Sequence, residues 1–318
     1  MENKEIILAL LEMAKPRTPS LPKTINFTII ASRLNIHLTE VCENMQSNES
    51  AFEGWILCLK VWFPNITQAN LTWETPVFDE GVKEDKNRKL HYNRFIYRLL
   101  QFRKMFIWFS FTTEDSKAIN DFEATDIKRK EINFPENDKA AGGHNEDIIE
   151  SLFVGKYNSL IKERLFLHHV NQQLPVGLFL NRKSSQTRLL PGGKAAIDIW
   201  GRDEDALSIF ELKYENEMVG IISELLLYLG IMNDVFIEGK IHYPEEAGFS
   251  EYREFHLLHE KVKKIKRLNG YFLVDTLHPL ITPRVVDLLN IGLREIGPIK
   301  VDTLYYNYYP QTKELSWK

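Results

Sequence analysis

Apolar and polar positions alternate with two different periods in the first part of the chain, and these periods predict its helices and strands. Helical spacing of apolar residues predicts helices over 4–14, 27–34 and 38–45. The run over 55–63 is rich in β-branched and aromatic residues, which predicts a strand. A second extended segment is expected over 70–77.

The second part of the chain predicts a more regular order of elements. The expected elements are helices over 145–169, 217–236 and 283–296, and strands over 176–180, 195–200, 207–214, 271–275, 301–309 and 314–317. The polar segment 201–206 is expected to close a hairpin between two of these strands. Helix, hairpin, helix, strand, helix and strand in this order predict a mixed sheet between helices.

Composition places the chain among ordinary globular proteins. Its residues are 44% hydrophobic and 26% charged, which excludes collagen-like and disordered classes. The length of 318 residues indicates two or three domains at roughly 100–150 residues each. The expected division is an α+β accessory domain over 1–77, a connecting region over 78–137 and an α/β domain over 138–318.

Charge and cysteine content exclude several functional classes. A formal net charge of -4 excludes a uniformly basic coat for nucleic acid, although local basic patches stay open. Cys42 and Cys58 are too few for a disulfide framework or a four-ligand zinc cluster. The first residues do not resemble a secretory signal, and Glu224 and Asp234 interrupt the apolar stretch 218–236. We therefore expect a cytoplasmic protein without a membrane span.

The predicted hairpin carries the residues with the clearest chemistry. Residues two apart on a strand share a face, so Glu211 and Lys213 project together while Phe210 and Leu212 face the other side. Pairing of the two strands brings Asp198 near Glu211. Two carboxylates and one ammonium group are thus expected in one patch.

Two adjacent carboxylates repel each other unless a proton or a cation lies between them. Mg²⁺ is commonly held by one or two carboxylates together with water and substrate phosphate. Such an ion polarises a phosphoryl oxygen and lowers the pKa of a bound water, while a lysine can offset charge at phosphorus. The pattern therefore favours metal-assisted hydrolysis of a phosphodiester.

The alternative for these charges is a solvated, ion-paired strand face in a structural or interaction protein, which a Glu-x-Lys triplet often forms. Ile209, Phe210 and Leu212 surround the triplet with apolar side chains. They favour a central strand, where an unpaired charge is costly.

Asp198 followed by Glu211-Leu212-Lys213 resembles the motif of the PD-(D/E)XK nuclease superfamily, which has the restriction-endonuclease-like fold. Apolar residues before both acids match its RecB-like branch. Gly142-Gly143-His144-Asn145-Glu146 is similar to the branch's Gly-hydrophobic-x-x-Glu element, with Gly143 at the hydrophobic position. The Gln-x-x-x-Tyr element on the next helix corresponds to Glu224 and Tyr228, with Glu in place of Gln.

The resemblance implies a restriction-endonuclease-like mixed sheet flanked by helices and a Mg²⁺ site, for which Mn²⁺ can substitute. Asp198, Glu211 and the Leu212 carbonyl would ligate the ion, and Glu146 would complete the site. Lys213 would orient the attacking water.

Three further residues have accessory positions with alternatives. Glu150 lies one helical turn after Glu146 and is equally able to face the site. Glu224 and Tyr228 are spaced for one face of a helix, so packing is the alternative role for Tyr228. The pair His168-His169 favours a helix end over a metal site.

The resemblance also implies the activity. We expect a Mg²⁺-dependent endonuclease, a hydrolase that cleaves DNA through metal-activated water and leaves 5′-phosphate ends. RNA as substrate and exonuclease action stay open, and a homodimer would supply two sites for cleavage of both strands. The alternative is a catalytically silent DNA-binding or regulatory protein with a nuclease-like fold.

The N-terminal segment has a weaker resemblance to a winged helix-turn-helix. Ala31, Asn35 and Val41 have the expected spacing of small, turn and buried residues, and Asn tolerates a left-handed turn. His37 would then lie on the recognition helix. The alternative is a three-helix module for packing or dimerisation.

A basic and aromatic segment follows at 86–113, with seven basic residues and no Asp or Glu. It is a candidate surface for nucleic acid, as is a second basic run over 261–267. The alternative is an amphipathic helix plus strand, with aromatic rings in the core and basic groups reaching solvent. The candidate nucleic-acid contacts in the two runs are Arg94, Arg98, Arg103, Lys104, Lys263 and Lys264.

Overall fold

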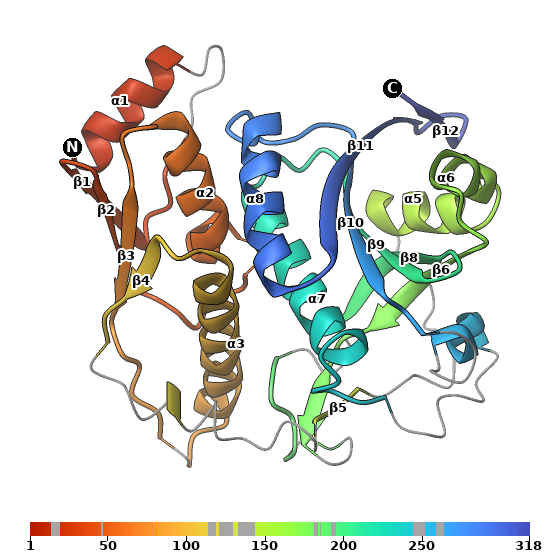
Figure 1. The fold of residues 1–318 in the computed structure, drawn as a ribbon, viewed down its shortest axis with the longest axis horizontal. Coiled ribbons are helices and arrows are strands. Elements are labelled where there is room, and N and C mark those ends of the chain that lie inside the picture. Colours follow the sequence, from red (N-terminus) through yellow and green to blue (C-terminus); the bar gives the residue numbers. More distant parts are fainter. Residues whose placement is uncertain are drawn as a thin grey trace. The chain divides into compact units, whose positions relative to one another are not determined.

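The chain folds into two units, each assembled from segments that are distant in sequence (Figure 1). Unit 1 comprises Met1–Thr125, Glu217–Leu226 and Leu277–Ile296, and unit 2 comprises Asp126–Asn216, Leu227–Thr276 and Gly297–Lys318. The computed structural model describes residues 1–13, 20–45, 47–79, 81–113, 119–120, 130–132, 144–180, 184, 186–191, 195–243, 252–258 and 264–318.

Unit 1 contains a four-stranded sheet in the order β1-β2-β3-β4. Its strands are β1 (Ile25–Ile30), β2 (Arg33–Leu38), β3 (Gln68–Trp73) and β4 (Phe109–Phe111). The first pair is antiparallel, and β2, β3 and β4 run parallel to one another. Alternate residues of β2 and β3 are buried, which gives the sheet one apolar face.

Helices cover that apolar face (Figure 1). The long connections between the parallel strands contain α2 (Phe52–Trp62) and α3 (Lys83–Met105), as parallel pairing requires. A further helix, α8 (Pro283–Ile296), packs against both of them. The N-terminal helix α1 (Asn3–Met13) contacts β1, and a short 3₁₀ turn, η1 (Asn48–Ser50), precedes α2.

Several predictions for this unit are wrong. The helix expected over 27–34 is replaced by the β1–β2 hairpin, which turns at Ala31 with a φ of 52°. The helix expected over 38–45 does not form either, because Leu38 ends β2 and residues 39–45 are irregular. Residues 27–45 therefore form no helix-turn-helix, and His37 lies on β2. The strand expected over 55–63 is the helix α2, buried on nearly all sides. Short apolar runs do not distinguish a buried strand from a buried helix, which explains the last error.

Other predictions for the first part of the chain are confirmed. The helix over 4–14 is α1, and the extended segment over 70–77 corresponds in part to β3. Residues 78–113 belong to unit 1 and do not form a separate connection, while the expected boundary at 137 falls outside the described residues.

Unit 2 contains a six-stranded mixed sheet in the order β12-β11-β10-β9-β8-β6. Its strands are β6 (His169–Pro175), β8 (Ala196–Arg202), β9 (Ala206–Lys213), β10 (Arg267–Val274), β11 (Ile299–Tyr309) and β12 (Glu314–Trp317). The three strands β9, β10 and β11 are parallel, and the outer pairings are antiparallel. Two short strands, β5 (Lys130–Ile132) and β7 (Leu178–Leu180), pair separately.

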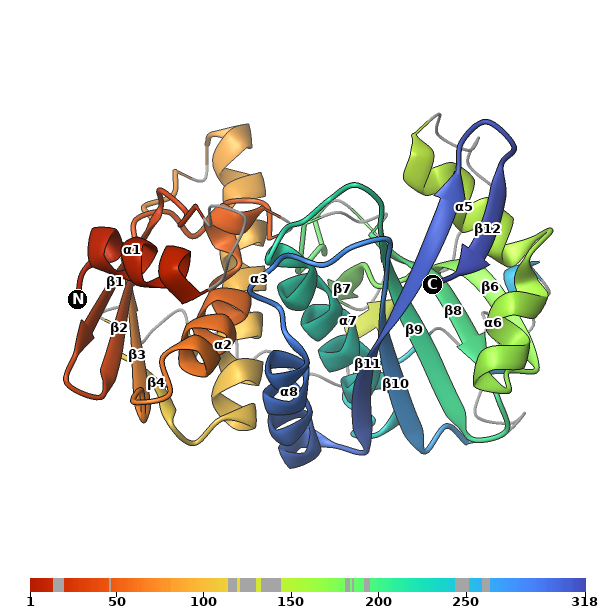
Figure 2. The same cartoon turned by 90° about the horizontal axis from the view of Figure 1, so that it is seen from above.

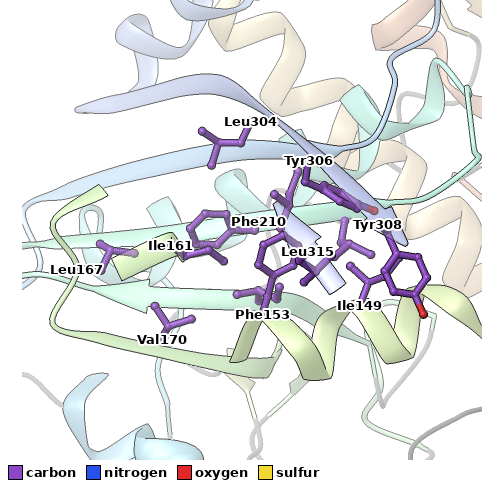
Figure 3. Packing of buried hydrophobic residues seen from close by; sticks show 13 residues of the cluster. Ile149, Phe153, Ile161, Leu167, Val170, Phe210, Leu304, Tyr306, Tyr308 and Leu315 are labelled. Carbon is purple, nitrogen blue, oxygen red and sulfur yellow. The ribbon is translucent and has the colours of Figure 1, made fainter. Parts of the chain in front are cut away.

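One face of this sheet packs on α5 (Asn145–Val154) and α6 (Asn158–Leu165) (Figure 2). Ile149 and Phe153 of α5 meet Phe210 of β9 in a buried cluster that also includes Leu315 (Figure 3). The helix expected over 145–169 is therefore two helices, and its last residue opens β6 instead.

The remaining elements of unit 2 follow the predicted order. The helix over 217–236 is confirmed as α7 (Gly220–Phe236), whose later half belongs to unit 2 and lies on the sheet face opposite α5 (Figures 1 and 2). The hairpin β8–β9 and the strands β10, β11 and β12 are confirmed as well, and so is the helix α8 of unit 1. The protein is thus mixed α/β. Across the parts of the chain that the structure describes, helices are too short or too polar to cross a membrane.

Gly292 in α8 allows a close contact, and its replacement by alanine is expected to destabilise unit 1. Alanine normally favours a helix over glycine by about 1 kcal/mol. Here a Cβ would overlap the buried ring of Phe106. Because overpacking typically costs about 1–3 kcal/mol, Gly292→Ala is expected to lower the free energy of unfolding. Urea denaturation measures this, with exposed Asp287→Ala on the same helix as the control. A Gly292→Ala protein as stable as its control would contradict the packing.

Candidate active site

The β8–β9 hairpin places Asp198 and Glu211 on one face of the sheet. Trp200 pairs with Ile209, and the pairing of the two strands stops at the next pair, Ile199 and Phe210. Asp198 lies two residues before Trp200, and Glu211 lies two residues after Ile209, so both side chains share the face of that pair. Where the ladder stops, the Leu212 N–H donates to Asp198 Oδ2 at 3.1 Å. The predicted hairpin is confirmed, and it brings the Asp198 carboxylate to the backbone directly after Glu211.

Glu211 and Lys213 form an ion pair inside unit 2. Their exposed fractions are 1% and 8%, and the Lys213 ammonium group donates to Glu211 Oε1. The interpretation of these charges as a solvated strand face is therefore wrong. Burying two ions costs desolvation energy that their attraction recovers only in part, so stability alone is a weak reason for the pair.

The helix α5 directs two acids toward the same strands. The Tyr214 N–H donates to Glu146 Oε1 at 3.2 Å, which fixes Glu146 against the backbone directly after Lys213. One turn later, Glu150 accepts two hydrogen bonds from Gln173 Nε2, at 2.9 and 3.0 Å. Both helix acids that the sequence left as alternatives thus reach the end of the hairpin.

Glu150 experiences the negative charge of Asp198. Burial, and after it the Asp198 carboxylate, raise the pKa of Glu150 to about 8, while the Gln173 hydrogen bonds and the positive charge of Arg253 act in the opposite direction. Glu150 is 7% exposed. The site therefore contains a third carboxyl group, which keeps its proton up to about pH 8.

Glu150→Gln is expected to remove a pH dependence of stability in metal-free buffer. The folded protein retains the Glu150 proton between the ordinary pKa of 4.5 and about 8, whereas the unfolded chain releases it. Wild-type stability therefore falls as the pH rises through this window. The variant should gain about 2 kcal/mol or more relative to wild type between about pH 5 and pH 8.

Urea unfolding in EDTA measures this gain, and Glu163→Gln on the exposed side of α6 is the matched control. A gain that is the same at both ends of the pH window, or equal to that of the control, would contradict a proton held on buried Glu150.

Residues that sequence reasoning missed complete the surroundings of the acids. The Tyr306 hydroxyl donates to the Lys213 carbonyl at 3.0 Å, and burial raises the pKa of Tyr306. The Glu215 N–H donates to Asp275 Oδ1 at 3.1 Å, which joins the segment after β9 to the end of β10. Gln173 departs from strand geometry with a φ of 55°. These contacts hold the carboxyl end of β9, and no local sequence signal points to them.

The two accessory residues of α7 are buried in different units. Glu224 lies in unit 1 with 1% exposure, and Tyr228 lies in unit 2 with 5% exposure. Gly142 and Gly143 lie outside the described residues.

The donor set is consistent with a hard divalent cation. No group of three or more His, Cys, Asp or Glu side chains within the described ranges is arranged to hold a metal ion. Mg²⁺ needs only one or two carboxylates from a protein, because water and substrate oxygens fill its other positions. Asp198 and Glu211, oxygen donors on adjoining strands, fit that requirement.

Two of the six candidate nucleic-acid contacts are buried. Arg94 and Arg98 lie inside unit 1, where Arg98 bonds Glu53 and the Ser50 carbonyl, so their prediction as surface contacts is wrong. Aromatic side chains of α3 lie in the core, as the alternative for that segment predicted. Of the other four candidates, Arg103, Lys104 and Lys264 are exposed, and Lys263 lies outside the described residues.

His168-His169 does not end a helix, because His169 opens β6 and its Nδ1 lies 3.2 Å from Glu254 Oε1. That helix-end interpretation is wrong.

Comparisons with known proteins leave the chain without an assigned relative. No protein-family model matches the chain, and neither a curated protein nor a solved structure matches it.

Proposed function

We propose that unit 2 is a nuclease that hydrolyses phosphodiester bonds of DNA with the help of Mg²⁺. The observation that supports this proposal is the convergence of Asp198, Glu211 and Lys213 on one face of a central hairpin, with the ammonium group already bonded to the second acid. The order of these residues and the mixed sheet are compatible with the restriction-endonuclease-like fold that the motif implies.

In this proposal Asp198 and Glu211 hold the cation, and the Leu212 carbonyl and Glu146 are the further ligands. A bound Mg²⁺, or Mn²⁺ in its place, would supply Lewis-acid polarisation of the phosphate. Glu146 is already fixed at the end of β9 by the Tyr214 N–H. Glu150 is the alternative helix acid, since it lies within the field of Asp198.

Lys213 has the role of the charged donor. Its neighbour Glu211 and its burial hold the ammonium group in one place, so little reorganisation is needed when negative charge develops at phosphorus. The same group can orient the attacking water by donating a hydrogen bond to it. A preorganised cation in a site shielded from solvent is worth more than one at the surface.

Cleavage assays with the full-length protein test the proposal. Supercoiled plasmid DNA and a labelled RNA are incubated with Mg²⁺, with Mn²⁺ and with EDTA. We expect cleavage of DNA with either metal, none in EDTA, and 5′-phosphate product ends. Cleavage that persists in EDTA would contradict the proposed chemistry. DNA binding without cleavage under any condition would support the catalytically silent alternative. Cross-linking during the assay tests whether a homodimer is the active form.

A further inference from the structure

A short 3₁₀ segment, η4 (Tyr252–Leu258), is attached to the sheet of unit 2 beside the candidate site. Glu254 Oε2 accepts a hydrogen bond of 2.7 Å from Asn171 Nδ2, and Glu254 Oε1 lies 3.2 Å from His169 Nδ1. The ring of Phe255 stacks on Trp200, with 6.2 Å between centroids. Polar and aromatic contacts from β6 and β8 thus fix the segment.

The backbone of this segment is strained where it precedes the stacked ring. Arg253 and Glu254 have φ values of 48° and 57°, the left-handed region that residues with a Cβ rarely adopt. Such a conformation costs about 1–3 kcal/mol per residue and persists only where surrounding contacts enforce it. The Glu254 and Phe255 contacts enforce it here. Strain of this kind often serves to hold one side chain in a required place, and the side chain at this turn is Arg253.

Arg253 lies on the same side of the sheet as the candidate acids. Asn171, which binds Glu254, pairs with Trp200, and Trp200 shares its face with Asp198. The positive charge of Arg253 lowers the pKa of Glu150, which the Asp198 charge raises, so all three groups are electrostatic neighbours. The Arg253 guanidinium lies over the Tyr252 ring, 5.0 Å from its centroid, and the side chain is half-buried.

An arginine in this position solves an electrostatic problem of the proposed reaction. Asp198 and Glu254 bring two carboxylates to the side of the sheet that a polyanion must approach, and like charges repel it. A guanidinium group is always charged, and its planar donors match the oxygens of a phosphate. Neutralisation of Glu150 alone is the competing explanation for Arg253, and the two explanations differ in their dependence on substrate.

Distance across the sheet indicates which phosphate is in reach. The segment η4 is held by Glu254 on β6 and by Phe255 on β8, and β6 is two strands from β9. Strands lie about 4.8 Å apart, so β6 is about 10 Å from the strand that carries Glu211 and Lys213. An arginine held beside β6 suits a phosphate next to the scissile one along the nucleic-acid backbone.

We propose, on the basis of the proposed function, that Arg253 binds a backbone phosphate next to the scissile one and so favours polynucleotides over small diesters. Arg253 is then a specificity residue that η4 holds in place through Glu254. The proposal involves no covalent step of its own.

The experiment compares two substrates and two kinds of variant. Duplex DNA and bis(p-nitrophenyl) phosphate, a small diester without a neighbouring phosphate, are hydrolysed in Mg²⁺ by wild type, Arg253→Gln and Arg253→Lys. Arg164→Ala on α6, the helix on the opposite sheet face, controls for loss of one positive charge. Glutamine keeps most of the length of the side chain and removes the charge. Lysine keeps the charge, so Arg253→Lys can be tested if Arg253→Gln does not fold.

We expect Arg253→Gln to lose about 10- to 100-fold in kcat/KM on duplex DNA, the value of one charge-assisted hydrogen bond. The factor lost on the small diester should be smaller by at least about tenfold. The slope of log affinity against log salt concentration should decrease by about 0.9, the value for one phosphate contact. Arg253→Lys should recover part of the loss. These effects should be absent from Arg164→Ala.

Equal losses on the two substrates, or an unchanged salt slope, would overturn the proposal and support a role confined to Glu150. If wild type cleaves DNA and Arg253→Gln matches it on both substrates, the inference about Arg253 fails while the proposed function stands. If wild type hydrolyses neither substrate, the proposed function itself fails.

Discussion

Lys213→Ala is expected to reduce Mg²⁺-dependent DNA cleavage about 100- to 1,000-fold while the protein stays folded. The variant loses a preorganised cation that faces the developing charge at phosphorus. Removal of one such preorganised group reduces kcat by about this factor in other enzymes. The ammonium group is held by Glu211 within unit 2, so water cannot take its place at low cost. Single-turnover cleavage of a labelled duplex measures the effect on the chemical step.

The matched control is Lys300→Ala, an exposed lysine on β11 of the same sheet. Circular dichroism and thermal melting establish that both variants fold. Because Lys213→Ala removes the ammonium group that pairs with buried Glu211, some loss of stability is expected as well. Equal rates for wild type, Lys213→Ala and Lys300→Ala would remove Lys213 from the reaction.

Arg98→Ala is expected to cause the largest loss of stability, about 3–5 kcal/mol in the free energy of unfolding. Arg98 Nε donates to Glu53 Oε1 at 2.7 Å, and the Ser223 hydroxyl donates to Glu53 Oε2 at 2.7 Å. Both ions of the pair are buried, so removal of the guanidinium leaves a buried carboxylate with too few donors. Urea denaturation followed by far-UV circular dichroism measures the loss.

Lys104→Ala on the exposed side of the same helix is the control for that experiment, with an expected change of no more than about 0.5 kcal/mol. Replacing both Glu53 and Arg98 by leucine and methionine should recover much of the stability, because a buried apolar pair needs no desolvation of ions. An Arg98→Ala protein as stable as Lys104→Ala would contradict the buried network.

The sequence predicted unit 2 well because its signals are local. The strands β8 and β9 alternate apolar and polar residues around a polar loop. This alternation alone predicts that Glu211 and Lys213 share one face of the strand, which the structure confirms. Burial of that pair needed the strands on either side of β9, whose order local patterns do not determine.

Unit 1 was predicted poorly because tertiary packing overrides its local pattern. The apolar runs of β1 and α2 are each short, and only the partners they meet in the fold decide between strand and helix. An arginine in a basic helix is expected at the surface, yet Arg98 bonds Glu53, which is 45 residues away in sequence. Contacts of this range leave no mark in a local window. The Glu254–Asn171 contact, 83 residues apart, is missed for the same reason.

Isothermal titration calorimetry with Mn²⁺ tests the central claim most directly, because it measures the proposed cation site without any substrate. We expect wild type to bind Mn²⁺ with about one site per chain, and Asp198→Asn and Glu211→Gln to lose the site. The control Asp302→Asn, at an exposed residue of β11, should bind Mn²⁺ as wild type does. Equal Mn²⁺ binding by all four folded proteins, or none by wild type, would contradict a cation held by Asp198 and Glu211.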